Sequence, residues 1–244
     1  TRIDMEEILE QCPNLEEMHF TRVQRVNLNL PLDTNYRSFG SRLTQLIITA
    51  CDLVTPHAPR IHPGFFAHLT ALKRIYIDKI KKLELVPDEI VSSPALEMLM
   101  LRNCSDLSKL PDAIGYKRWN RPSPGSGFYF YGSTRNLDYI PLSFGFLFTQ
   151  KPAPHANELY FPPLMTPRSS EYTVSNLPQH LRDSYFRAKS FARWLRDKGW
   201  SYTEDKTEAE ARQQVLDFVR QERGGEGEPD AQRVRVGSSF VCIE

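Results

Sequence analysis

The chain lacks the sequence features of several protein classes. Its 244 residues contain no long uninterrupted run of apolar residues, whereas a membrane-spanning helix needs about 20 of them in succession. The formal net charge is only +1, and basic residues are interspersed with acidic ones. Charge therefore gives no reason to expect nucleic acid or a membrane surface as a partner, and we expect no membrane span.

Motifs of catalysis are also missing. The sequence has no Gly-rich phosphate loop, no H-E-x-x-H and no G-x-S-x-G, the motifs that position phosphates, catalytic metals and nucleophilic serines. His57, His62 and His68 lie near one another, but they are spaced irregularly through a proline-rich stretch, which is not a metal-binding pattern. We predict that the chain is not an enzyme and that it takes no cofactor, no metal and no small-molecule substrate.

Cysteines are few and unpaired in the sequence. The four of them, Cys12, Cys51, Cys104 and Cys242, form no C-x-x-C motif. Disulfides persist mainly in oxidising compartments, where cysteines tend to occur in paired frameworks. We therefore expect reduced thiols and a cytoplasmic location, with the nucleus as the alternative.

The most informative feature that the chain does have is a recurring pattern. The segment Leu72-x-x-Ile75-x-Ile77 returns 24 residues later as Leu96-x-x-Leu99-x-Leu101. Related segments begin at Leu43 and, in degenerate form, at Leu15 and Ser126. Recurrence at such a period predicts a solenoid, in which each unit buries its apolar face only against its neighbours.

These segments resemble the leucine-rich repeat family, whose pattern is L-x-x-L-x-L-x-x-N/C-x-L. The resemblance covers roughly residues 5–150, with Cys51 and Cys104 at the N/C position. The Leu110-Pro111 turn resembles intracellular plant-type repeats, and the opening Cys12-Pro13 resembles the cysteine-containing repeats of ubiquitin-ligase receptors. The resemblance implies an α/β solenoid with parallel strands on its concave face and an irregular or helical convex side.

We expect two regions. Residues 1–165 form about five irregular repeats, which we interpret as the end of a longer array, and residues 166–244 form a C-terminal appendage. In the second region, an apolar stripe at helical spacing starts after Pro178 and stops at Gly199, and a capping box at Thr207-x-x-Glu210 starts a second helix. A flexible Gly/Glu linker and terminal strand segments follow.

Alternation along the strands predicts the binding surface. Residues between the buried ones point to the concave face, where ligands of leucine-rich repeats usually dock. The expected partner-binding residues are Ile47, Arg74, Tyr76, Met98, Met100, Arg102, Phe128 and Phe130. Two alternatives stay open: the C-terminal helices could cover this patch, or a one-residue slip in the fifth repeat could bury Phe128 and Phe130 and expose Tyr129 and Tyr131.

The pattern favours a non-catalytic protein–protein interaction module that binds a protein partner on its concave face. Two alternatives use the same surface: the ligand-sensing repeats of a nucleotide-binding immune-type receptor, and the substrate-recognition repeats of an F-box ubiquitin-ligase receptor. Outside this face, Trp119 in its Pro/Gly-rich loop and the basic helix around Arg193 are secondary candidates for contacts.

Overall fold

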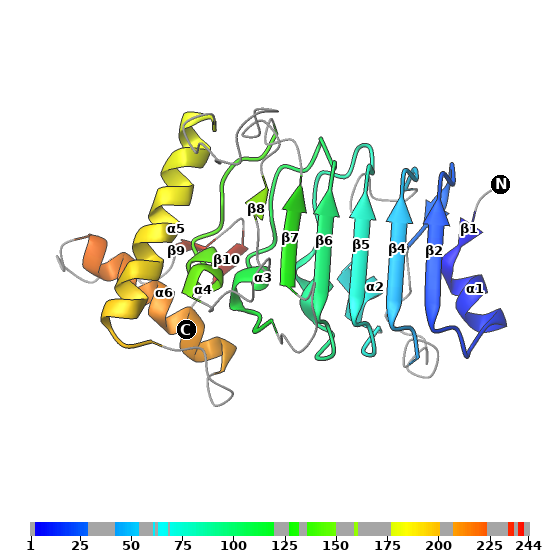
Figure 1. Ribbon diagram of the computed structural model, residues 1–244, viewed down its shortest axis with the longest axis horizontal. Coiled ribbons are helices and arrows are strands. Elements are labelled where there is room, and N and C mark those ends of the chain that lie inside the picture. The colour runs from blue at the N-terminus through cyan, green and yellow to red at the C-terminus, as the bar shows by residue number, and fades with distance from the viewer. Residues whose placement is uncertain are drawn as a thin grey trace, which may run out of the picture.

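The computed structural model describes most of the chain. The described residues are 3–28, 42–53, 61, 63–67, 69–119, 127–131, 136–149, 159–160, 177–200, 207–223, 234–236 and 239–241. They form a mixed α/β structure in which one parallel sheet is followed by two long helices (Figure 1). The α/β class expected from the sequence is confirmed.

A six-stranded sheet with the order β2-β4-β5-β6-β7-β8 runs through the molecule (Figure 1). All of its neighbouring strands are parallel. Its strands are β2 (Glu17–Thr21), β4 (Gln45–Thr49), β5 (Arg74–Asp78), β6 (Met98–Arg102), β7 (Gly127–Tyr131) and β8 (Leu159–Tyr160). The strands lie side by side in sequence order, as expected where each segment packs only on its neighbours.

The apolar positions of the recurring segments form the core beneath this sheet. Ile75 pairs with Leu99 and Ile77 with Leu101 in parallel register, and all four are 0% exposed. The predicted burial of the segments that begin at Leu72 and Leu96 is thereby confirmed. Complete burial of each such side chain contributes about 1.5–3 kcal/mol relative to leaving it in water.

Short helices cover the buried face of the sheet. They are α2 (Pro63–Ala67), the 3₁₀ helix η2 (Asp88–Val91), α3 (Ala113–Tyr116) and α4 (Phe144–Thr149). Phe66, Ile90, Ile114 and Phe144 project from them into the core that the strand residues form. The sheet is therefore covered on one face by this row of helices, and we call its opposite face the outer face.

Four strands of the sheet end in the same tight turn. The residues that follow β2, β4, β5 and β6 have left-handed backbone conformations with φ between 52° and 56°; they are Arg22, Ala50, Lys79 and Asn103. Few non-glycine residues adopt this region, so its recurrence reflects the same chain reversal each time. The backbone bonds continue through it, since Ala50 N–H donates to the carbonyl of Asp78 and Lys79 N–H to that of Arg102.

Cysteine side chains turn inward just after this reversal. Cys51 donates to the carbonyl of Thr49 at 3.3 Å, and Cys104 donates to the carbonyl of Arg102 at 3.4 Å. Both are free thiols, 1% exposed, as the sequence predicts, and Cys12 is free and exposed. Burial raises the pKa of the Cys104 thiol to about 11. It therefore stays protonated near neutral pH and is a poor nucleophile. Cys242 lies outside the described residues.

The N-terminal end of the sheet carries a small attachment. Helix α1 (Met5–Gln11) precedes β2, and β1 (Ile3–Asp4) pairs in parallel with β3 (Val26–Asn27). Asn27 donates to the carboxylate of Asp4 at 3.1 Å, and Val26 is completely buried. This pairing ties α1 to the first segment of the sheet.

Two long helices close the other end, and both begin where the sequence predicts. Helix α5 (Gln179–Asp197) follows Pro178 and stops before Gly199, whose φ is +68°. Helix α6 (Glu208–Glu222) starts with the predicted capping box: the Thr207 hydroxyl accepts from Glu210 N–H, and the Glu210 carboxylate accepts from Thr207 N–H. Such a cap stabilises a helix by about 1 kcal/mol.

Helices α5 and α6 pack on the row of short helices and not on the outer face of β4, β5 and β6 (Figure 1). Ser184 of α5 donates a hydrogen bond to the carbonyl of Leu181 and accepts one from Ile140 N–H at 2.9 Å. Phe146 of α4 meets the ring of Phe191 at 5.1 Å, and Phe218 of α6 joins the same buried cluster. Strands β9 (Val234–Val236) and β10 (Ser239–Val241) form a separate antiparallel pair.

Candidate functional site

The outer face of the sheet brings six of the eight predicted binding residues together. Ile47, Tyr76 and Met100 occupy matching positions of β4, β5 and β6 and are each partly exposed. Met98 lies beside Arg74 in the register and is also partly exposed, whereas Arg74 and Arg102 are exposed. We call this set, Ile47, Arg74, Tyr76, Met98, Met100 and Arg102, the outer-face patch.

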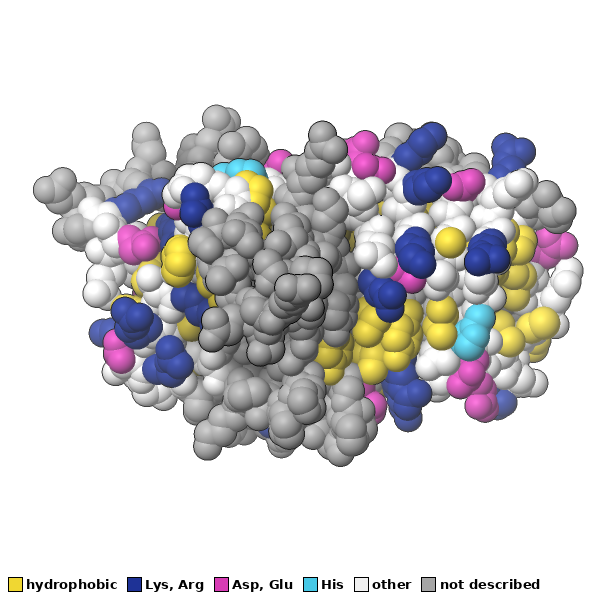
Figure 2. Space-filling view, turned by 45° about the horizontal axis from the view of Figure 1, so that its top comes forward, with side chains coloured by type: hydrophobic (Ala, Val, Ile, Leu, Met, Phe, Trp, Pro, Cys, Tyr) yellow, Lys and Arg dark blue, Asp and Glu magenta, His cyan; other side chains and the backbone are white. Residues whose placement is uncertain are grey.

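Figure 2 shows the patch as a group of hydrophobic side chains over β4 to β6 with Lys and Arg side chains around it. The alternation of the strands explains why these residues gather. In β4 the side chains of Leu46 and Ile48 are 0% exposed, and Ile47 between them faces the other way. The core therefore fixes the position of every second residue, and the residues between them are held on a rigid sheet.

The prediction for Phe128 and Phe130 is wrong. Both are 1% exposed, because β7 aligns Phe128 with Leu99 and Phe130 with Leu101, one residue out of the expected frame. Phe128 packs its ring at 5.6 Å from that of Phe144 and at 6.3 Å from that of Trp119. Large aromatic side chains gain most when they are fully removed from water, and here they fill the core at the C-terminal end of the sheet.

The slip also changes the end of the outer column. Tyr129 takes the outward position and aligns with Met100, but it is only 6% exposed. Among the described side chains, the exposed part of the column therefore ends at β6. The slip that the sequence left open as an alternative is confirmed for the two phenylalanines, whereas the exposure that it implied for Tyr129 is not found. The side chain of Tyr131 lies outside the described residues.

Polar side chains flank the patch and contact one another across strands. Asp78 accepts from Asn103 Nδ2 at 3.0 Å and lies 3.6 Å from Arg102 Nε. On the other side, Gln45 and His19 are hydrogen-bonded at 3.1 Å. Exposed pairs of this kind contribute little to stability. The apolar side chains of the patch between these pairs are partly exposed to water.

Trp119 is not a surface anchor. It is 3% exposed, and its Nε1 donates to the carbonyl of Ile114 at 3.2 Å. The neighbouring Lys117 donates to the carbonyl of Ser93 at 3.0 Å, and burial lowers its pKa to about 8. Of the two secondary candidates, this one belongs to the core. The loop residues 120–126 lie outside the described residues.

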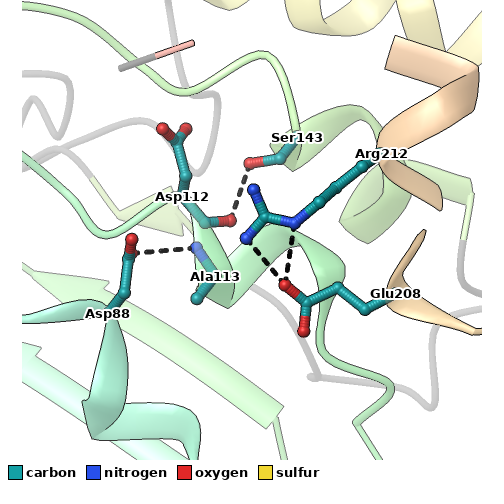
Figure 3. Close-up of polar contacts among 6 residues, drawn as sticks. All are labelled: Asp88, Asp112, Ala113, Ser143, Glu208 and Arg212. Atoms are coloured by element: carbon teal, nitrogen blue, oxygen red, sulfur yellow. Dashed lines mark hydrogen bonds and ion pairs between the residues drawn. The ribbon is translucent and has the colours of Figure 1, made fainter. Parts of the chain in front are cut away.

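Among the carboxyl groups of the described residues, the most perturbed lies on the helical side, where η2, α3 and α6 meet (Figure 3). Burial, and next the neighbouring charge of Asp88, raise the pKa of Asp112 to about 6, although the charge of Arg212 acts in the opposite direction. Sequence reasoning did not single out this residue, because only the fold brings α6 to it.

The contacts around Asp112 join parts of the fold. Asp88 accepts from Ala113 N–H at 3.1 Å, and the Ser143 hydroxyl donates to the carbonyl of Asp112 at 2.9 Å. Arg212 is bound by Glu208 at 2.7 Å and lies 4.7 Å above the ring of Tyr116. A perturbed carboxyl group can mark a catalytic site. Here Asp88 caps the start of α3, and Arg212 holds α6 against α3. We therefore interpret the cluster as a structural junction.

No metal site is found in the part of the chain that the structure describes, where no group of three or more His, Cys, Asp or Glu side chains could hold an ion. His57, His62 and His68 lie outside that part. In the same residues, no helix is long and apolar enough to cross a membrane.

Comparison with known proteins adds no identification. No protein-family model matches the chain, and no curated protein matches its sequence. The function must therefore be argued from the chemistry of the outer-face patch itself.

Proposed function

We propose that the chain is a non-catalytic protein-binding module with a leucine-rich repeat architecture, and that the outer-face patch binds a protein partner. One observation carries the proposal: Ile47, Tyr76 and Met100 form a continuous, partly exposed apolar column on a rigid parallel sheet. In this proposal the outer face is the concave face of a solenoid that binds in the cytoplasm or nucleus.

The composition of the patch supports binding. Cores of protein interfaces are enriched in aromatic residues, Met and Arg, and the patch consists of these types and one isoleucine. Tyr76 offers a large, stiff contact area, whereas Met98 and Met100 are flexible and can adapt to a partner. Arg74 and Arg102 stand at the margin, where they can bind carboxylates or carbonyls of the partner.

Three features support the solenoid architecture. The segments recur at similar length, and their strands pair in register with the same positions buried. Four of the strands are followed by a residue in the same left-handed backbone conformation. The free thiols of Cys51 and Cys104 at equivalent positions support a reducing compartment.

The test compares partner binding with folding. A partner is first isolated with the wild-type chain as bait, and its affinity is then measured for Tyr76→Ala and Met100→Ala. Truncation of central interface residues often costs about 2 kcal/mol or more, so each variant should bind at least about tenfold more weakly. Because both side chains are partly exposed, the thermal unfolding of the variants should stay close to that of wild type.

Lys81→Ala serves as the control, since Lys81 is exposed and lies outside the patch. It should change neither affinity nor unfolding. If Tyr76→Ala and Met100→Ala bind the partner as wild type does, the outer-face patch is not the site. If they unfold the protein, the patch is part of the core.

A further inference from the structure

The exposed side of α5 carries an aromatic and basic stripe that the proposed function does not use. Phe186, Lys189, Arg193 and Arg196 follow one another at intervals of three, four and three residues, and all four are exposed. These intervals place them on one side of a helix. An adjoining side of the helix is fully buried through Leu181, Ala188, Ala192 and Leu195. We call the four exposed residues the α5 stripe.

Phe186 is unusual among the described residues. It is 55% exposed, and no other large hydrophobic side chain in the described part of the chain is exposed. The centre of its ring lies 5.8 Å from that of Tyr185. A single exposed apolar residue is common on protein surfaces, so the argument depends on the charges beside it.

Some arginines of α5 and α6 are paired with carboxylates, whereas the arginines of the α5 stripe are not. Arg187 binds Glu222 at 2.8 Å and Arg212 binds Glu208 at 2.7 Å. In the described part of the chain, Arg193 and Arg196 lie within 4 Å of no carboxylate oxygen, and the pKa of Lys189 is lowered by burial and then by the charge of Arg196. Figure 2 shows Lys and Arg side chains over this end of the molecule.

Two carboxylates on α5 limit the stripe. Asp183 accepts a hydrogen bond from Gln179 at 2.7 Å, and Asp197 is exposed at the last position of the helix. Between them, from Phe186 to Arg196, α5 has cations and no anion. At 1.5 Å per residue, this section is roughly 15 Å long.

We infer that the α5 stripe docks an acidic segment of a protein partner, with an apolar residue of that segment placed against Phe186. The cations at helical spacing match carboxylates that repeat along one side of a helix or an extended peptide. Lys189 already lies over the ring of Phe148 at 4.0 Å, which fixes one cation in place. The surface is separate from the outer-face patch and does not depend on it.

A membrane surface fits these observations less well. Helices that lie on membranes insert an apolar face several ångströms deep. The apolar face of α5 is instead buried against α4 and α6, as in the contact of Phe191 with Phe146. Only Phe186 remains for insertion, whereas an acidic peptide needs only one apolar contact and a row of counter-charges.

The probe for the test is a fluorescein-labelled peptide that is rich in Glu and contains Phe. The peptide is titrated with the full chain, and its fluorescence anisotropy is measured. The same peptide with Gln in place of Glu, and vesicles of phosphatidylserine and phosphatidylcholine, are titrated in parallel. We expect wild type to bind the Glu peptide, and to bind the Gln peptide and the vesicles at least about tenfold more weakly. Failure to bind the Glu peptide, or tighter binding of the vesicles, would overturn the inference.

Matched variants separate this site from general electrostatic attraction. Arg193→Glu/Arg196→Glu should weaken binding of the Glu peptide by about tenfold or more, and Phe186→Ser should weaken it severalfold without a change of charge. Lys73→Glu/Lys81→Glu changes the net charge equally, at exposed residues away from α5, and should weaken binding less than about twofold. Equal loss in the two double variants contradicts a site on α5. If the first double variant unfolds, Arg193→Gln/Arg196→Gln replaces it.

Discussion

At the scale of single residues, the side chains on the two sides of a strand differ in their exposure to water. Leu99 is 0% exposed whereas Met100, the next residue, is partly exposed. The recurring leucines and isoleucines therefore form the core, and the residues between them are available for contact. Cys51 and Cys104 complete the core after the chain reversals that follow β4 and β6, where their thiols donate hydrogen bonds to backbone carbonyls.

Asp112 is a residue whose ionisation opposes folding. Its pKa is raised to about 6 in the folded protein, by burial and then by the charge of Asp88, and its side chain makes no capping bond. The folded state therefore holds the proton more tightly than the unfolded state, and stability is lost as the pH rises from about 4 through 6.

We predict that Asp112→Asn stabilises the protein at pH 7.5 by roughly 1–3 kcal/mol, since one pKa unit corresponds to about 1.4 kcal/mol. The difference should shrink as the pH is lowered to 5, where the folded wild type keeps the proton. Urea unfolding of both proteins at the two pH values measures it. A difference that does not depend on pH, or a variant less stable than wild type at pH 7.5, would show that the carboxylate is well solvated or favourably bound.

At the scale of elements, strands were predictable where one side of the pattern is clearly apolar. In β4, β5 and β6 the buried positions are Leu and Ile, and the register agrees with the expected frame. In β7 the sequence Gly127-Phe-Tyr-Phe-Tyr131 places aromatic residues on both sides. Alternation alone cannot then assign the faces, and the opening leucine that would have set the frame is missing.

The helices show a similar division. The apolar residues of α5 repeat at helical spacing over several turns, and α6 starts with a capping box. Both helices therefore begin and end close to the predicted positions. The packing of these helices was not predictable, because the aromatic cluster of Phe146, Phe191 and Phe218 joins residues far apart in the chain. The same holds for the junction at Asp112.

The corrected register of β7 can be tested directly. Phe130→Ala should lower the free energy of unfolding by about 3–5 kcal/mol, as truncation of a buried phenylalanine does. An outward-facing phenylalanine on the surface would cost about 0.5 kcal/mol or less. Guanidinium unfolding measures the difference, with Leu99→Ala, at a buried position of the neighbouring strand β6, as the reference for a core truncation. A small loss of unfolding free energy for Phe130→Ala would contradict this register and favour the one expected from the sequence, in which Phe130 faces outward.

At the scale of the whole molecule, the sheet has one covered and one accessible face. The short helices cover the first, and α5 and α6 extend that cover past the end of the sheet (Figure 1). The outer face keeps its apolar column over β4, β5 and β6 partly exposed. This division gives the proposed binding module a rigid scaffold, and the residues of the patch can vary without loss of the core.

The most direct test places a photo-crosslinking side chain, benzoylphenylalanine, at position 76, where it replaces Tyr76 by another aromatic group. A matched protein carries it at the exposed position of Lys81. After irradiation with the isolated partner, the account predicts a covalent adduct from position 76 and none from position 81, as seen by gel and mass spectrometry. Adduct formation from position 81 alone would contradict the claim that the partner binds the outer face of the sheet.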